Sequence, residues 1–173
     1  MKLQGKTIAI LVAEGVEDLE YYVPMMRLQE EGAHVLTAGL DLKPVRGKNG
    51  LVIAPDAKID ALDAGELLAL ILPGGWAPDK LRRYDAVKDL VRKMDDDKKV
   101  IGVICHGGLI PISAGIIKQG QRATGSLGIK DDLVNAGATW VDEAAFQERN
   151  QVWGRVVADI PDFCRELINA LIG

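Results

Sequence analysis

The sequence predicts an α/β fold: a doubly wound, mostly parallel sheet sandwiched by helices, with a small β-hairpin. Two observations predict it. Short, wholly apolar runs recur along the chain, and segments with apolar residues at helical spacing separate them. A wholly apolar run is typical of a strand buried on both faces, as in a parallel sheet covered by helices. We expect one domain, residues 1–173, because no linker, repeat or low-complexity tract interrupts the chain.

The first half of the chain contributes strands, one helix and the hairpin. Its expected strands are residues 7–13, 33–38 and 67–72. Residues 17–31 carry apolar side chains at helical spacing, and Gly32 ends that helix. Residues 41–60 are rich in turn formers, including Asn49-Gly50, and predict the β-hairpin.

The second half repeats the alternation. Its expected strands are residues 100–104, 139–141, 145–147 and 152–156. Its expected helices are residues 85–96, 128–136 and 161–172. The first and last of these helices are amphipathic, which is typical of helices that cover a sheet.

The composition excludes several classes of function. The net charge is -4 and basic residues do not cluster, so we expect no nucleic-acid partner. No apolar stretch is long enough to span a bilayer, so we expect no membrane association. The two cysteines, without a signal-peptide pattern, are expected to be free thiols in a reducing cytoplasm.

The pair Cys105-His106 is the strongest chemical signal in the chain. It follows the apolar run 100–104 and precedes Gly107-Gly108, so the expected strand stops, turns sharply and places a thiol at the start of a helix. A helix N-terminus and a nearby imidazole both lower the pKa of a thiol. Cys105 is therefore a candidate nucleophile, with His106 as general base and acid.

Other candidate residues follow the same ends of neighbouring strands. The first expected strand leads to Glu17, the third to Gly74, Gly75 and Asp79, and the fourth to Cys105. Because the carboxyl ends of parallel strands meet at one sheet edge, we expect these groups to lie together. An acidic side chain, Asp79 or Glu17, would orient or charge-balance the imidazole or the thiol.

Glycines at this edge can expose backbone N–H groups to a substrate. Gly74 and Gly75, with the N–H of His106, are expected to form an oxyanion hole, and Gly107 and Trp76 to line the substrate site. No metal-ligand spacing occurs, so we expect no metal and no cofactor.

Each feature also has a structural interpretation. A cysteine after a strand is usually a small buried hydrophobe, and a carboxylate at a helix start usually serves the helix dipole. We expect Cys164, in the last helix, and His34, in a strand, to be structural. For the residues around Cys105, their convergence at one sheet edge favours a reactive site.

Four short motifs stand out along the chain: Glu17-Asp18-Leu19-Glu20, Leu72-Pro73-Gly74-Gly75, Ile104-Cys105-His106-Gly107 and Gly128-Ile129-Lys130-Asp131-Asp132. They resemble the ThiJ/PfpI superfamily, and most closely its branch of PfpI-type intracellular proteases. The resemblance continues through residues 136–142 and 155–159, and so covers nearly the whole chain in order. The strand–Cys–His elbow alone also fits class I glutamine amidotransferases, which share the fold.

The resemblance implies a flavodoxin-like sandwich with Cys105 on a strained nucleophile elbow and His106 as its catalytic partner. It places the glutamate that hydrogen-bonds the cysteine and tunes its pKa at Glu17. A third catalytic acid, supplied by a neighbouring subunit of a homodimer or homohexamer, falls at Asp79, one methylene shorter than the usual glutamate.

The chain departs from the pattern of the superfamily at two further places. Gly108 stands where a proline is usual, which would loosen the start of the helix after Cys105. Ser126 and Leu127 stand where the branch often carries tyrosine-proline near the site.

The resemblance implies a cytoplasmic cysteine hydrolase acting on a small carbonyl or peptide substrate. The activities of the family are those of a peptidase, a glyoxalase-like lyase on methylglyoxal, and a deglycase on glycated amino acids. All use the same thiolate on a carbonyl carbon. The alternatives are a redox-sensing stress-response protein or chaperone, in which Cys105 is oxidised without turnover, and a scaffold whose site has decayed.

Overall fold

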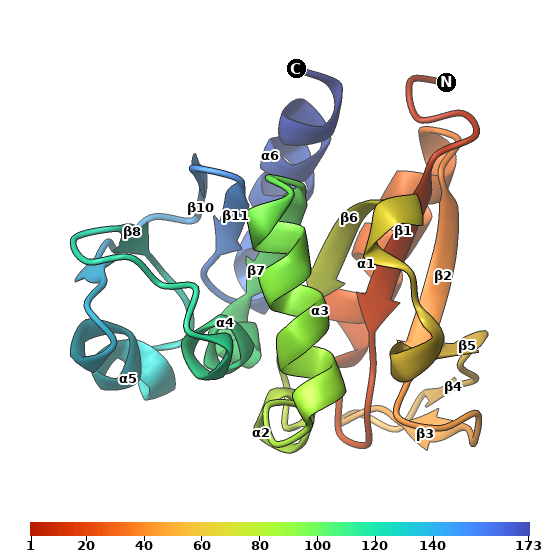
Figure 1. The fold of residues 1–173 in the computed structure, drawn as a ribbon, viewed down its shortest axis with the longest axis horizontal. Helices are drawn as coiled ribbons and strands as arrows, with labels where there is room; N and C mark the ends of the chain where they lie inside the picture. Colours follow the sequence, from red (N-terminus) through yellow and green to blue (C-terminus); the bar gives the residue numbers. More distant parts are fainter.

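The computed structural model describes all residues, 1–173, and its centre is a seven-stranded sheet (Figure 1). The strand order is β10-β11-β7-β6-β1-β2-β5, and every neighbouring pair is parallel except β10 and β11. The strands are β1 (Thr7–Leu11), β2 (His34–Gly39), β5 (Ala57–Lys58), β6 (Leu67–Leu72), β7 (Val100–Ile104), β10 (Ala145–Glu148) and β11 (Gln151–Gly154). The predicted doubly wound fold is confirmed.

Helices cover both faces of the sheet, which explains why its central strands are wholly apolar. They are α1 (Asp18–Glu30), α2 (Ala77–Leu81), α3 (Asp85–Asp96), α4 (Leu109–Ala114), α5 (Lys130–Asn135) and α6 (Ile160–Ile172). Figure 1 shows α3 in front of the sheet and α1 and α6 behind it, and α1 and α6 contact each other. None of these helices is long and apolar enough to cross a membrane.

Two small sheets complete the structure. The predicted hairpin is present as the antiparallel strands β3 (Val45–Arg46) and β4 (Val52–Ile53). Strands β8 (Arg122–Ala123) and β9 (Thr139–Trp140) pair in parallel. The sequence did not predict β5, α2 or β8, each of which has five residues or fewer.

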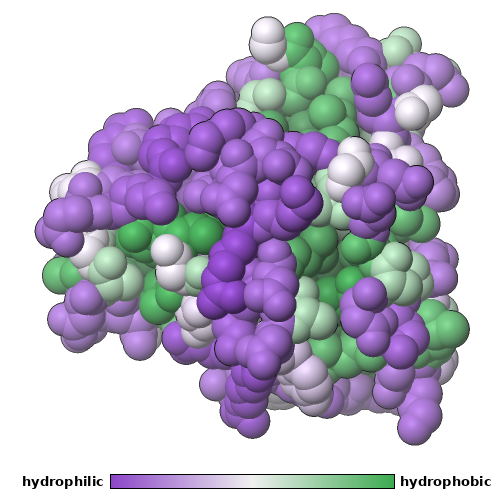
Figure 2. Space-filling model, in the orientation of Figure 1, coloured by the Kyte–Doolittle hydropathy of each residue, from purple (hydrophilic) through white to green (hydrophobic).

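Helix α1 places part of its apolar stripe on the outside. Leu19, Val23 and Met26 are exposed, whereas Tyr21 and Leu28 face the core together with the carboxyl of Glu20. Because these three side chains are exposed, the outward stripe of α1 is a surface feature rather than part of the core. The opposite face of the molecule, on the side of α3, is mostly hydrophilic with separate apolar patches (Figure 2).

Candidate active site

Cys105 lies at a sharp elbow between β7 and the helical turn that leads into α4. Its φ of 58° is in the left-handed region, which costs a non-glycine residue about 1–2 kcal/mol. The next turn can pack tightly because Gly107 has no side chain: a Cβ there would collide with the carbonyl oxygen of Leu72 at the end of β6. The predicted strained elbow is present, and it holds the thiol at the carboxyl edge of the sheet.

His106 extends from the same elbow and contacts the thiol. Its Nδ1 lies 3.4 Å from the Sγ of Cys105. Burial, followed by the positive charge of Lys48, lowers the pKa of His106 below its usual value of 6.5. The imidazole is therefore neutral at pH 7 and is able to accept a proton.

The carboxyl group beside the thiol belongs to Glu20. This side chain is fully buried in the first turn of α1, and its Oε2 accepts a hydrogen bond of 2.6 Å from the N–H of Gly74. A Cβ on Gly74 would lie 2.6 Å from Glu20 Oε2 and 2.9 Å from the Cβ of Cys105. Gly74 is thus a glycine because the carboxyl, the thiol and the β6 loop all meet at this point.

The ionisation of Glu20 and that of Cys105 are coupled. Burial is the main cause that raises the pKa of Glu20 to about 7. Burial, followed by the negative charge of Glu20, raises the pKa of Cys105 to about 12, while the N–H of His106 opposes this by donating to the sulfur. A thiolate and a carboxylate side by side in a buried site repel each other, so the Cys105 thiolate is favoured when Glu20 holds a proton.

Glu17, which was expected to hydrogen-bond Cys105, does not do so. It is the N-cap of α1: its Oε2 accepts from the backbone N–H groups of Leu19, at 2.8 Å, and Glu20, at 3.0 Å. Its Oε1 accepts from the side-chain amide of Asn49 at 2.7 Å. The assignment of Glu17 to the thiol is therefore wrong, because the helix end uses one of its oxygens and the hairpin the other.

The expected oxyanion hole is smaller than predicted. The N–H of Gly74 is donated to Glu20 and is not free for a substrate. The N–H of Gly75 makes no hydrogen bond within the protein, and the backbone there has a φ of 76° in an isolated antiparallel bridge with Val16. Gly75 thus remains the candidate donor, together with the N–H of His106 once charge leaves the sulfur.

Other expected site residues take different positions. Gly107 is buried against Leu72 and so serves packing rather than substrate contact. Trp76 is 67% exposed, and its ring packs over Gly15 beside the glycine pair. Asp79 lies on α2 and forms an ion pair with Arg83 on the protein surface, without a hydrogen bond to His106 of its own chain.

The chain matches the model of the DJ-1/PfpI family over residues 6–170. The chain belongs to the DJ-1/PfpI family. It is 38% identical to Deglycase TK1284 of Thermococcus kodakarensis over 95% of this chain and 98% of that protein. It is 36% identical to the Putative cysteine protease YraA of Bacillus subtilis over 96% of this chain and 99% of that protein.

A solved structure shows the same architecture. A two-domain protein of Anabaena variabilis, with DJ-1/ThiJ/PfpI-like and ferritin-like domains, superposes with a TM-score of 0.93 and 32% identity. The match covers 96% of this chain and 48% of that protein, so this chain spans about half of its length. The family and the flavodoxin-like fold predicted from the sequence are both confirmed.

The structure explains one departure from the DJ-1/PfpI motif. A Cβ on Gly108 would lie 2.8 Å from the Cδ1 of Ile129 and 3.2 Å from the ring of Trp153, so these side chains fill the space that a larger residue would need. The start of α4 is therefore packed rather than loosened. At the other departure, Ser126 caps a short helical turn and Leu127 is 76% exposed.

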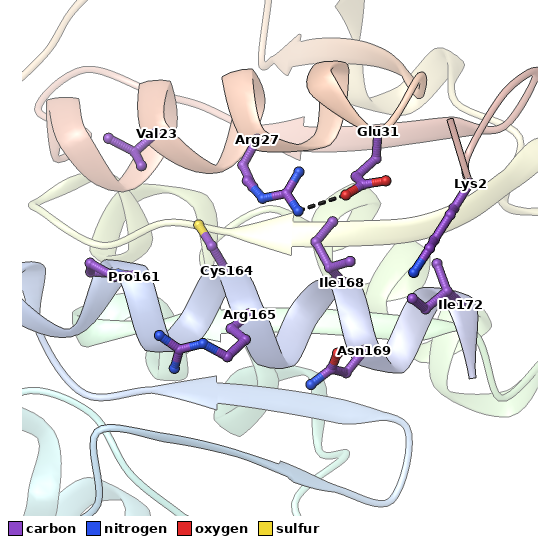
Figure 3. A pocket seen from close by; sticks show the side chains of 10 residues that line it. All are labelled: Lys2, Val23, Arg27, Glu31, Pro161, Cys164, Arg165, Ile168, Asn169 and Ile172. Atoms are coloured by element: carbon purple, nitrogen blue, oxygen red, sulfur yellow. Dashed lines mark hydrogen bonds and ion pairs between the residues drawn. The ribbon is translucent and has the colours of Figure 1, made fainter.

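The remaining cysteine and histidine lie away from the site. Cys164 is buried in α6, beside a groove of about 540 Å³ between α1 and α6 (Figure 3), where burial raises the pKa of its thiol to about 11. His34 pairs with Thr7 at the amino end of the parallel strands, the edge opposite Cys105. No three His, Cys, Asp or Glu side chains gather as ligands for a metal ion.

Proposed function

We propose that this chain is a cysteine hydrolase that acts on the carbonyl carbon of small carbonyl compounds, with deglycase activity as the favoured reaction. The observation that carries the proposal is the elbow that holds the Cys105 thiol between the carboxyl of Glu20 and the imidazole of His106. The names of two relatives support the proposal: one is a deglycase, which matches the favoured reaction, and the other is a putative cysteine protease, which matches the use of a thiol.

The chemistry begins with addition of the Cys105 thiolate to the substrate carbonyl. The sulfur–carbon bond forms, the π electrons of the carbonyl move to its oxygen, and the N–H of Gly75 stabilises that charge. With an amide, the intermediate expels the amine, to which His106 passes the thiol proton, and a thioester remains. With a methylglyoxal adduct, the amine leaves as the adduct reverts to the aldehyde, and the thiolate adds to that aldehyde. His106 then moves a proton from the former aldehyde carbon to the neighbouring carbonyl carbon, which converts the hemithioacetal into a thioester. Water hydrolyses either thioester to the acid, and the sulfur regains its proton.

A comparison of variants on three substrates tests the proposal. Wild type, Cys105→Ala and the matched control Cys164→Ala are assayed with methylglyoxal, a glycated amino acid and a peptide amide. We expect turnover by wild type and by Cys164→Ala, and loss of turnover in Cys105→Ala. Equal turnover by Cys105→Ala, or peroxide oxidation of Cys105 without turnover of any substrate, contradicts the hydrolase and in the second case favours the redox sensor.

We further propose that Asp79 acts on the site of a neighbouring copy. Its exposed position on α2 supports this role, and the outward apolar residues Leu19, Val23 and Met26 of α1 offer a surface for self-association. A mixture of Asp79→Asn and Cys105→Ala chains should regain activity, because one of the mixed sites combines an intact cysteine with an intact Asp79. No recovery in mixed oligomers of proven composition contradicts the shared site.

A further inference from the structure

The tip of the β3–β4 hairpin is fastened to the start of α1. Asp18, which is 2% exposed, accepts hydrogen bonds from the backbone N–H of Asn49 at 2.7 Å and of Leu51 at 2.9 Å. Gly47 lies so close to Asp18 that a Cβ would collide with its carboxylate. With the amide of Asn49 on Glu17, two carboxylates hold the tip in one place.

This attachment brings Lys48 to the rim of the active site. Its backbone N–H donates to the carbonyl of Val16 at 2.8 Å, and Val16 forms the isolated bridge with Gly75. The next residue, Glu17, donates its N–H to the carbonyl of Gly74 at 3.2 Å. Lys48 is therefore linked through two short backbone contacts to the glycine pair that faces Cys105.

The ammonium group of Lys48 is exposed and has no ion-pair partner, and its charge reaches the reacting groups. It lowers the pKa values of Glu20, Cys105 and His106. A positive charge held on a fixed loop beside a nucleophile, with no carboxylate within ion-pair distance, is suited to binding an anion.

We propose that Lys48 is a specificity-determining residue that selects substrates with a carboxylate close to the carbon attacked by Cys105, such as an α-oxo acid or, at a distance of a few bonds, a carbonyl adduct of an amino acid. That the substrate is a carbonyl compound rests on the proposed function. That its carboxylate is recognised follows from the position of Lys48 on the hairpin loop. A neutral carbonyl compound of the same size gains nothing from this charge.

Two alkylating reagents test the inference without turnover. Iodoacetate and iodoacetamide react in the same way: the thiolate sulfur bonds to the methylene carbon and iodide leaves. They differ in that one carries a carboxylate and the other a neutral amide. The rates of Cys105 alkylation are measured by intact mass in a Cys164→Ala background, for wild type, Lys48→Met, Lys48→Arg and the matched control Lys43→Met, which removes the same charge from another exposed lysine.

We expect Lys48→Met to lower the iodoacetate-to-iodoacetamide rate ratio about three- to tenfold at low salt, with a smaller loss at high salt. Lys48→Arg and Lys43→Met should keep the wild-type ratio. An unchanged ratio in Lys48→Met, or an equal fall in Lys43→Met, overturns the inference. Because the readout is alkylation, failure of the proposed function appears separately, as an absence of Cys105-dependent turnover.

Discussion

Replacing Glu20 by glutamine tests whether this carboxyl controls the ionisation of Cys105. The pKa of the thiol is raised from 9.0 to about 12, which corresponds to about 4 kcal/mol against the thiolate. Burial is the larger cause and persists in the variant, because glutamine has nearly the same shape. The charge of Glu20 is the second cause and is removed, so we expect the thiol pKa to fall by about one pH unit.

The assay is the rate of alkylation of Cys105 by iodoacetamide between pH 5 and 10, in a Cys164→Ala background. In the parent protein the pair loses its first proton at a pKa of about 7, so the reactive state with thiolate and protonated Glu20 should stop increasing there. Glu20→Gln has no such proton, and its rate should rise without a bend. The alkylation rate of Glu20→Gln divided by that of the parent protein should grow from about one at pH 6 to about ten above pH 8.

A bend near pH 7 that persists in Glu20→Gln would refute this reasoning. His106 is the other group that titrates in this range, but its pKa lies below 6.5, and a His106→Gln variant should keep the bend. Thermal unfolding of each variant checks that the fold is retained, since the glutamine oxygen can still accept the hydrogen bond from Gly74.

Three other predictions concern stability and the hairpin. The pKa of Glu20 rises from 4.5 to about 7 on folding, so the folded protein holds this proton more tightly than the unfolded chain. The free energy of unfolding should therefore fall by up to about 3 kcal/mol as the pH rises from 4.5 to 7, and this fall should be absent in Glu20→Gln. Parallel pH profiles of the two proteins in denaturant titrations would contradict this. Cys105→Gly should be more stable than Cys105→Ala by about 1 kcal/mol in the same titrations, because glycine tolerates the left-handed φ of 58°; equal stability would argue against strain. Asp18→Ala should release the hairpin tip and speed amide exchange at Asn49 at least tenfold, whereas unchanged exchange would show that other contacts suffice.

Sequence patterns sufficed for most of the fold because long, wholly apolar strands carry a strong signal. Residues 67–72, 85–96 and 100–104 were predicted with the bounds that the structure shows. The short elements were missed for a physical reason. A two-residue strand such as Ala57–Lys58 contains no period, and its pairing with β2 depends on where the tertiary structure places it.

The sequence predicts which residues of the candidate site lie together, because the backbone topology determines their positions. It does not predict their hydrogen-bond partners, because these depend on the direction of each side chain and N–H group. Cys105, His106 and the glycine pair all follow strand ends, and topology alone brings them together. The role of Gly74 was different from the one expected, because its N–H turns to a buried carboxylate. Strand order predicts which loops meet, but not which of their N–H groups remains free.

The three carboxylates of residues 17–20 bind different partners, and this decides between Glu17 and Glu20 as the residue that acts on Cys105. Glu17 precedes the first turn of α1, where the unpaired N–H groups of the helix attract its oxygen. Glu20 lies one turn further on, pointing inward, and nothing at Gly74 blocks its approach to the thiol. Asp18, between them, turns to the hairpin. All three carboxyls are buried, but Glu17 is held by the helix end and Asp18 by the hairpin, which leaves Glu20 free to share a proton with Cys105. The hydrogen-bond partners, rather than burial or position in the motif, therefore identify the glutamate that governs the nucleophile.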